Sequence, residues 1–249
     1  MEVKRRNFQG VLNILSFNRH FYVAGVVALA LTIGSKFIFN WHNGLFSLVI
    51  LVFIYGLTMP LFVSAYIYDF SGFYNFDWLK TMKIEDTKEK FNLNINAGFD
   101  ETSFILESIL PNSKLQAYDF YNANQHTEQA IIRARKVSLV YPNTQQIKSN
   151  SIPLNDNSVD NIFLLSAIHE IRIHEEKVHF LKECRRVCKP NGNVIMVEHL
   201  RDFPNFVAFT IGFTHFFSRA TLKKAFEEAG FTSFKETKFT PFMSIFSCN

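Results

Sequence analysis

The sequence predicts an α/β protein: a doubly wound, mainly parallel seven-stranded sheet, preceded by a transmembrane α-helical hairpin. Two observations support this prediction. Apolar residues crowd between Phe21 and Tyr68, and from about residue 90 short apolar runs alternate with helical patterns. The 249 residues are 48% hydrophobic, which is ample for a core. We divide the chain into a basic N-terminus (1–20), the hairpin (21–68), an amphipathic linker (69–90) and the α/β domain (91–249).

Charge and cysteine content exclude several classes of protein. The formal net charge is +4, with 26 basic and 22 acidic residues and no long positive run, so we expect no nucleic-acid partner. The three cysteines, Cys184, Cys188 and Cys248, show no C-x-x-C spacing. This argues against both a disulfide framework and a structural zinc site.

The apolar region contains two segments long enough to cross a bilayer. Residues 21–39 and 45–68 can each span a hydrocarbon core of about 30 Å. The connector, 40–44, is so short that the two spans would form an antiparallel hairpin. Two alternatives remain open: a signal peptide cleaved near residues 28–30, and a buried helical pair in a soluble protein.

The distribution of basic residues predicts the orientation of this hairpin. Lys4, Arg5, Arg6 and Arg19 precede the first span, whereas the connector contains no lysine or arginine. By the positive-inside rule the N-terminus lies in the cytoplasm. The hairpin then returns the α/β domain to the cytoplasmic side.

Beyond residue 90, strands and helices are expected to alternate. We expect strands at 91–96, 114–119, 145–148, 160–165, 193–198, 233–239 and 243–247, and helices at 101–110, 126–136, 175–187 and 219–229. Such alternation implies right-handed crossovers and a sheet covered on both faces. Ligands bind such sheets beyond the carboxyl ends of the strands, so residues that follow the strands are the candidates for a site.

The turn after the first strand is typical of a nucleotide-binding loop. Asn94, Asn96, Gly98 and Asp100 fall at alternate positions there, and glycine permits a positive φ and a close backbone approach to a ligand. Asp119 ends the second strand, where a ribose-binding carboxylate is expected.

Residues 90–249 resemble the class I S-adenosylmethionine-dependent methyltransferases. This turn and the segments 152–160 and 185–198 carry the resemblance. The resemblance implies a Rossmann-like sheet and S-adenosylmethionine as the cofactor. It places Asn94, Asn96 and Gly98 in the glycine motif, Asp119 on the ribose hydroxyls and Phe120 against the adenine. Ser149 and Ser166 follow the third and fourth strands and complete the expected cofactor site.

The chain departs from the family at several of these positions. Asn94 replaces an acid, two glycines are missing, and Lys148, Ser149 and Asn150 stand where an acid would meet the adenine amine. A catalytically degenerate relative that acts as a binding or scaffold protein is therefore the alternative.

Two histidines next to carboxylates are candidates for the chemistry. His169 and Glu170 follow the fourth strand, while Glu198 and His199 end the fifth. Histidine titrates near neutral pH, so His169 or His199 is a candidate base for O-methylation, oriented by Glu170 or Glu198. A purely structural role is the alternative. The same four side chains suit a metal ion, but nothing in the sequence fixes their geometry, so we predict none.

An apolar, aromatic segment at 203–217 follows the fifth strand and would form a substrate wall, with His215 as a weaker candidate base. Next to a membrane hairpin, this wall suggests a hydrophobic substrate that partitions into the bilayer. We therefore expect a methyltransferase in the bacterial inner membrane that acts on an aromatic lipid, pigment or quinone precursor and contacts membrane lipids. Methylation of a phospholipid or a protein is the other alternative.

Overall fold

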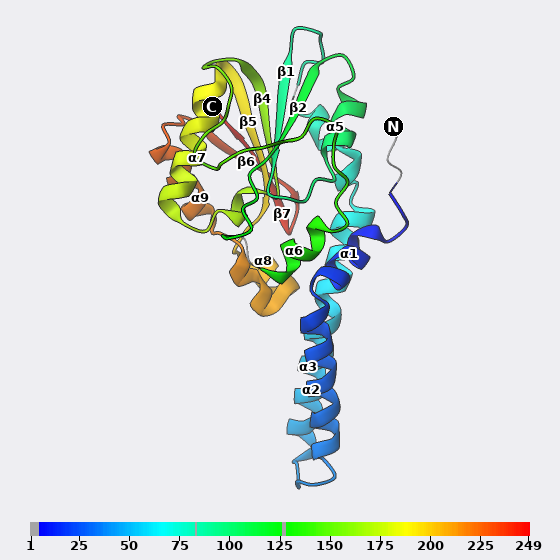
Figure 1. Ribbon diagram of the computed structural model, residues 1–249. Coiled ribbons are helices and arrows are strands. Elements are labelled where there is room, and N and C mark those ends of the chain that lie inside the picture. Colours follow the sequence, from blue (N-terminus) through cyan, green and yellow to red (C-terminus); the bar gives the residue numbers. More distant parts are fainter. Residues whose placement is uncertain (1–4, 83, 126–127) are drawn as a thin grey trace.

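A computed structural model describes residues 5–82, 84–125 and 128–249 and divides the chain into an α/β domain and a helical stalk (Figure 1). The stalk is the antiparallel pair α2 (Arg19–Ser35) and α3 (Asn43–Ala65). Lys4 and the first two residues of the helix expected at 126–136 lie outside the described residues.

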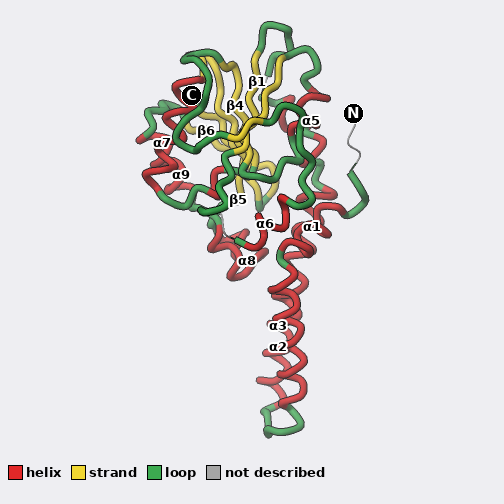
Figure 2. The backbone as a smooth tube through the Cα atoms, in the orientation of Figure 1, coloured by secondary structure: helices red, strands yellow, loops and turns green. Residues whose placement is uncertain are grey.

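The domain is built on a single seven-stranded sheet in the order β3-β2-β1-β4-β5-β7-β6 (Figure 2). The strands are β1 (Phe91–Asn96), β2 (Lys114–Asp119), β3 (Gln145–Gln146), β4 (Val159–Leu165), β5 (Cys188–His199), β6 (Phe234–Thr240) and β7 (Met243–Cys248). Only β7 runs antiparallel to its neighbours. The predicted α/β fold with a mostly parallel seven-stranded sheet is confirmed.

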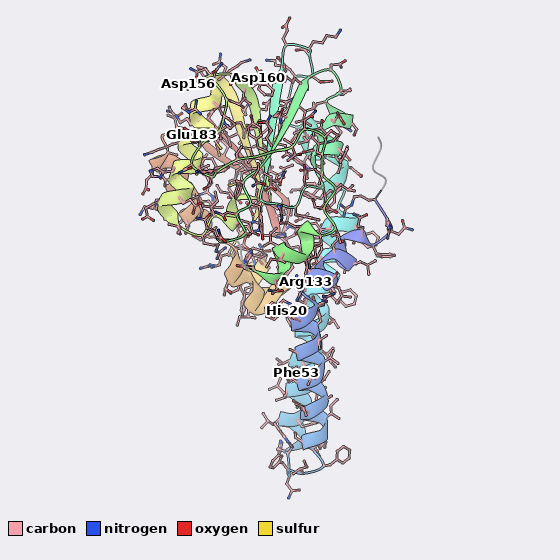
Figure 3. All side chains as sticks on the ribbon, in the orientation of Figure 1. His20, Phe53, Arg133, Asp156, Asp160 and Glu183 are labelled. Carbon is pink, nitrogen blue, oxygen red and sulfur yellow. The ribbon has the colours of Figure 1, made fainter. Side chains whose placement is uncertain are left out.

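The fifth strand begins earlier than the sequence predicts. The strand was expected at 193–198, yet residues 188–192 also belong to β5, because Cys188 pairs with Val159 across a register shift in β4. Lys189 Nζ, 2.7 Å from Asp160 Oδ2, fastens this extension to β4 (Asp160 is labelled in Figure 3). Proline and glycine in the segment are therefore compatible with an extended conformation here.

Helices cover both faces of the sheet. On one face α7 (His174–Val187) and α9 (Arg219–Glu228) bury Phe180 and Phe226 against the strands. The other face is covered by α5 (Ser103–Ile109) and by three short helices. These are the π-helix Tyr66–Phe70, the 3₁₀ helix Phe73–Asn75 and α4 (Asp77–Lys80). The segment predicted as a linker, 69–90, thus supplies core residues, among them Phe76 and Trp78.

The stalk is apolar and exposed. By length and composition, among the described residues one helical run, Asn43–Asn75, could cross a membrane, and α1 (Gln9–Phe17) with α2 forms a second candidate bent by 73°. Only 6% of the most apolar window of Asn43–Asn75 is buried. This low burial distinguishes α3 from the core helix of a soluble protein.

The carboxyl ends of the parallel strands face the stalk. Two short helices, α6 (Gln129–Arg135) and α8 (Phe203–Phe209), lie between the sheet edge and the stalk (Figure 1). Arg133 of α6 donates to the carbonyl of Phe17 at 2.6 Å and lies 2.7 Å from His20 Nδ1 (Figure 3). Tyr55 Oη donates to the carbonyl of Val207 in α8. The carboxyl ends of the strands, where ligands bind in such folds, are therefore joined directly to the apolar helices.

Candidate active site

The turn after β1 keeps one glycine in an unusual conformation. Gly98 has a φ of +96°, which suits glycine because it lacks a Cβ. Asn96 Oδ1 accepts from the Gly98 N–H at 2.9 Å, whereas its buried Nδ2 has no partner among the described residues. Asn94 turns the other way and donates to Ser103 Oγ at 2.8 Å, so it stabilises the start of α5.

The carboxylate at the end of β2 is held by the chain itself. Asp119 Oδ1 accepts from the Tyr121 N–H and Oδ2 from Arg135 Nη1, both at 2.8 Å. The Arg135 guanidinium lies over the Tyr121 ring at 4.1 Å. It also fills the space beside Gly98, because a Cβ built on Gly98 would lie 2.5 Å from Arg135 Nη1.

These residues fit a nucleoside-bearing cofactor once Arg135 withdraws. The Asp119 carboxylate can accept two ribose hydroxyls, and the unpartnered Asn96 Nδ2 is a donor that awaits an acceptor. Arg135 is the movable part, since its side chain is 35% exposed and rotates about several single bonds.

The structure places the remaining predicted cofactor residues less favourably. Phe120 is buried against Phe180, with ring centres 5.2 Å apart, so it belongs to the core in this conformation. Ser149 Oγ donates to Glu176 Oε1 at 2.5 Å. Ser166 directly follows β4, has a φ of +52° and donates its N–H to the carbonyl of Val197. The contacts of these three residues with a cofactor stay predictions.

His169 and Glu198 form a buried pair between the ends of β4 and β5. His169 Nδ1 lies 2.8 Å from Glu198 Oε2, and Glu198 Oε1 accepts from the Ile168 N–H at 3.0 Å. Burial alone lowers the pKa of His169, but the carboxylates of Glu198 and Glu170 outweigh it and raise this pKa to about 10. His169 is therefore cationic at neutral pH in this conformation.

His199 is fully engaged in the structure. Its Nδ1 lies 2.8 Å from the carbonyl of Phe242, which can only accept, so Nδ1 carries the proton and donates. Nε2 then accepts from Tyr68 Oη at 2.8 Å. Burial lowers the pKa of His199, which keeps the ring neutral. His199 thus ties β5 to the segment after α3, and its role as a base stays a prediction.

Two residues near the candidate site, Lys177 and Arg135, were not identified as candidates from the sequence. Lys177 Nζ lies 3.1 Å from the centre of the Phe217 ring, and burial next to Arg172 lowers its pKa to about 8. The signal was available: Lys177 shares a helical face with Leu181 and Cys184 in the sequence. Arg135 offered no such signal, because a basic residue in the last turn of a helix is ordinary.

One family model matches the central part of the chain in sequence. Residues 103–196 match the family described as "Methyltransferase domain". The match begins after Gly98 but includes Asp119 and His169. No curated protein matches the chain in sequence.

Several solved structures are similar to this chain, and one of them has a TM-score above 0.5. A candidate O-methyltransferase from Nostoc punctiforme is 14% identical with a TM-score of 0.52, over 76% of this chain and 59% of that one. An S-adenosylmethionine-dependent methyltransferase from Aquifex aeolicus is 21% identical, with a TM-score of 0.48 and coverages of 72% and 92%. Human N-acetylserotonin methyltransferase, solved with S-adenosylmethionine, is 13% identical, with a TM-score of 0.48 and coverages of 77% and 55%.

The family match over residues 103–196 supports an S-adenosylmethionine-dependent methyltransferase domain, and the Nostoc structure shares its fold. The substrate is left unspecified by these likenesses, because one fold serves many reactions.

Proposed function

We propose that the chain is a membrane-anchored S-adenosylmethionine-dependent methyltransferase that methylates a hydroxyl of a hydrophobic small molecule. One observation carries the proposal: the Gly98–Asp119 cofactor site and the His169–Glu198 pair lie at the sheet edge that faces the apolar stalk. Cofactor and acceptor would then meet where the domain approaches the bilayer.

The chain's residues have separate tasks in this reaction. Bound S-adenosylmethionine supplies an electrophilic methyl group. Asp119 and Asn96 would hold the nucleoside, and the mouth between β4 and β5 would align the acceptor oxygen in line with the methyl carbon. His169, in its neutral form, would take the hydroxyl proton, and Glu198 would position the ring and stabilise the resulting imidazolium.

The apolar surface supports a substrate that dissolves in the membrane. Phe203, Phe206 and Ile211 protrude from α8 and the following 3₁₀ helix, Thr210–His215, with Ile211 82% exposed. The Tyr55–Val207 contact places this surface beside α3. A lipophilic acceptor could enter from the bilayer along this surface without crossing water, whose contact costs about 25 cal/mol per Å² of apolar area.

Location in a bacterial inner membrane, with the domain on the cytoplasmic side, belongs to the same proposal. Arg5 pairs with Glu101 of the domain and Arg19 begins α2, whereas the described connector between α2 and α3, at the far end of the stalk, carries a single lysine, Lys36, and no arginine. This asymmetry follows the positive-inside rule. Membrane lipids are then the partners of the stalk.

A scaffold without catalytic activity is the second candidate, because Arg135 occupies the cofactor's place beside Gly98. Titration of the detergent-solubilised chain with S-adenosylhomocysteine separates the two. A ligand at 100 times its Kd adds about 2.7 kcal/mol of stability, so the enzyme should melt at a higher temperature. An unchanged melting temperature at saturating ligand would favour the scaffold.

Lipid profiling of a deletion strain tests the substrate class. We expect the strain to accumulate a lipophilic compound that is lighter by one methylene than its wild-type counterpart. Labelled methyl groups in the phospholipid or protein fraction, and not in the pigment and quinone extract, would contradict a small-molecule acceptor.

A further inference from the structure

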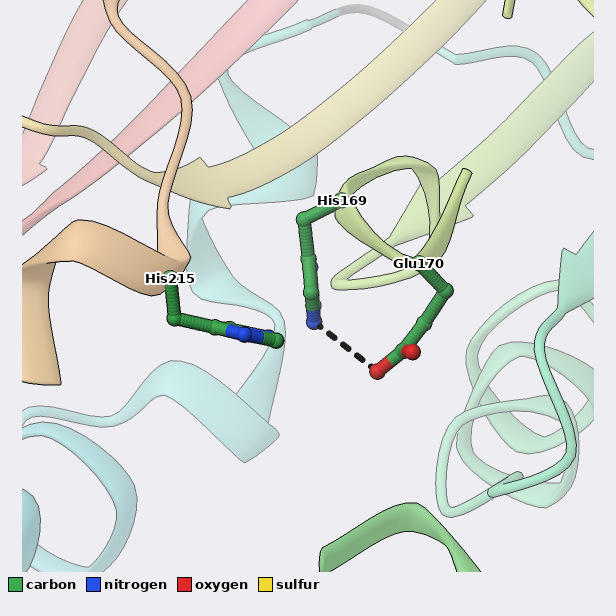
Figure 4. Close-up of side chains that lie close together, drawn as sticks. All are labelled: His169, Glu170 and His215. Atoms are coloured by element: carbon green, nitrogen blue, oxygen red, sulfur yellow. Dashed lines mark ion pairs between the residues drawn. The ribbon is translucent and has the colours of Figure 1, made fainter. Parts of the chain in front are cut away.

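Three side chains converge at the mouth of the site from two separate elements (Figure 4). His169 and Glu170 lie in the 3₁₀ turn Ile168–Glu170 after β4, and His215 ends the helix Thr210–His215. One ligand atom from each lies within 4.8 Å of the other two. We propose that His169, Glu170 and His215 bind a divalent transition-metal ion such as Zn²⁺.

The distances suit a metal ion after a small contraction. Ligands about 2.0–2.1 Å from a tetrahedral ion lie about 3.3 Å from one another. His169 Nε2 and Glu170 Oε1 are already 3.4 Å apart. The His169 and His215 rings have centres 5.1 Å apart and an interplanar angle of 73°, so closure needs only small side-chain rotations.

The chemistry of the three ligands selects the kind of ion. Two imidazoles and one carboxylate are ligands for zinc and for iron, cobalt or nickel, whereas calcium and magnesium prefer oxygen alone. Three protein ligands leave a fourth position open, as in catalytic zinc sites and unlike structural ones.

A carboxylate behind His169 prepares it for this role. Glu198, only 1% exposed, lies 2.8 Å from His169 Nδ1 and is itself held by the Ile168 N–H. Metal-bound histidines almost always donate their second nitrogen to a carboxylate or carbonyl, which directs the first nitrogen at the ion. Glu128 Oε2, 3.4 Å from His215 Nδ1, places a further carboxylate beside the second imidazole.

The position of this cluster suggests what the ion would do. It lies at the end of β4, next to the strand whose end carries Gly98, so an acceptor hydroxyl in the open position would face the cofactor site. In the metal-bound form His169 would be a ligand and not the base; the cation would lower the pKa of a hydroxyl that it contacts, and the proton would pass to solvent. This role rests on the proposed methyl transfer, whereas binding of the ion does not.

Binding is tested on the untagged, full-length chain in detergent after treatment with a chelator. Calorimetric titration with ZnCl₂ should show one ion per chain, and CoCl₂ should produce the visible absorption of four-coordinate cobalt. Glu170→Gln and His215→Gln should each weaken binding by 100-fold or more, and Glu198→Gln by about 10–100-fold.

His174→Gln is the matched control. His174 Nε2 lies 2.8 Å from Glu228 Oε2, so it forms a histidine–carboxylate pair without a third ligand among the described residues. This variant should bind zinc as the wild type does. Absence of stoichiometric binding to the wild type, or wild-type affinity in both Glu170→Gln and His215→Gln, would overturn the proposal.

Folding and cofactor binding are measured in parallel. A zinc-dependent rise in the melting temperature of the wild type, absent in a Glu170→Gln variant that still melts cooperatively, supports the site. If S-adenosylhomocysteine stabilises the chain but no ion binds, the metal inference fails and the methyltransferase stands. If the ion binds without any effect of S-adenosylhomocysteine, the metal site stands and the proposed function fails.

Discussion

Tyr68 Oη donates a 2.8 Å hydrogen bond to His199 Nε2 and thereby joins the segment that follows α3 to the end of β5. The two aromatic rings meet edge to face, with centres 6.0 Å apart. On its other face His199 stacks on Phe216, at 4.9 Å and 22°. The stalk is therefore anchored at the same strand end that carries Glu198.

Removal of this hydrogen bond should destabilise the domain. Tyr68→Phe leaves the buried Nε2 of His199 without a donor, which costs about 1–3 kcal/mol. Denaturant unfolding in detergent, followed by tryptophan fluorescence, measures the change. Tyr66→Phe is the control, because the exposed Tyr66 hydroxyl has no hydrogen bond in the described structure, and it should shift stability by less than about 0.5 kcal/mol. Equal losses in both variants would refute the anchoring role.

In the proposed cofactor site, Arg135 would have to leave Asp119 before the ribose could bind there. Arg135→Ala should therefore bind S-adenosylhomocysteine more tightly, since the ligand no longer has to displace the guanidinium. A partly exposed ion pair is worth about 0.2–1 kcal/mol, so the gain should not exceed about fivefold.

Lys136→Ala is the matched control for Arg135→Ala. It removes the same charge one residue later, at the exposed end of α6, and leaves the Asp119 pair intact. Calorimetric affinities of both variants give the answer. Weaker binding by Arg135→Ala would mean that Arg135 holds the cofactor instead of excluding it.

β1 and β2 could be predicted from the sequence because apolar residues recur within each of them, between polar turns. The observed β1 and β2 coincide with the predicted 91–96 and 114–119. The functional geometry was less accessible. His199 and Arg135 act through partners distant in sequence, Tyr68 and Asp119, and no local pattern specifies such contacts. Likewise, Phe76 and Trp78 were assigned to a linker from the sequence. Their burial depends on the face of the sheet that they cover, which the local sequence does not show.

The raised pKa of His169 predicts how stability depends on pH. The folded-state pKa of about 10 lies above the ordinary value of 6.5, so the charged ring contributes stability that is fully present below about pH 6.5. This contribution is lost as the pH rises toward 10. The melting temperature of the metal-free protein should therefore fall between pH 7 and pH 10, and His169→Gln should reduce that slope. His215 has the opposite effect on stability, because burial next to His169 lowers its pKa to about 4. Its contribution is lost as the pH falls from about 6.5 toward 4.

The same pKa predicts the pH dependence of catalysis. If neutral His169 is the base, the kcat/KM of the metal-free enzyme should rise about tenfold per pH unit above neutrality, until the pH approaches 10. His169→Gln should abolish this rise while leaving affinity for S-adenosylhomocysteine unchanged. A pH-independent rate in metal-free enzyme, or full activity in the variant, would exclude His169 as the base.

A single charge in the middle of α3 tests whether the stalk spans a membrane. Leu51 is 61% exposed there, and an aspartate near the centre of a span costs about 2.5–3.5 kcal/mol on insertion. Leu51→Asp should therefore shift part of the chain from the membrane fraction, after alkaline extraction, into the supernatant or into degradation products. Ile173→Asp introduces the same charge at an exposed apolar position of the α/β domain and should leave the wild-type distribution unchanged. If the wild type itself is extracted at high pH, the stalk does not cross the bilayer, and its exposed apolar surface must be covered by protein instead.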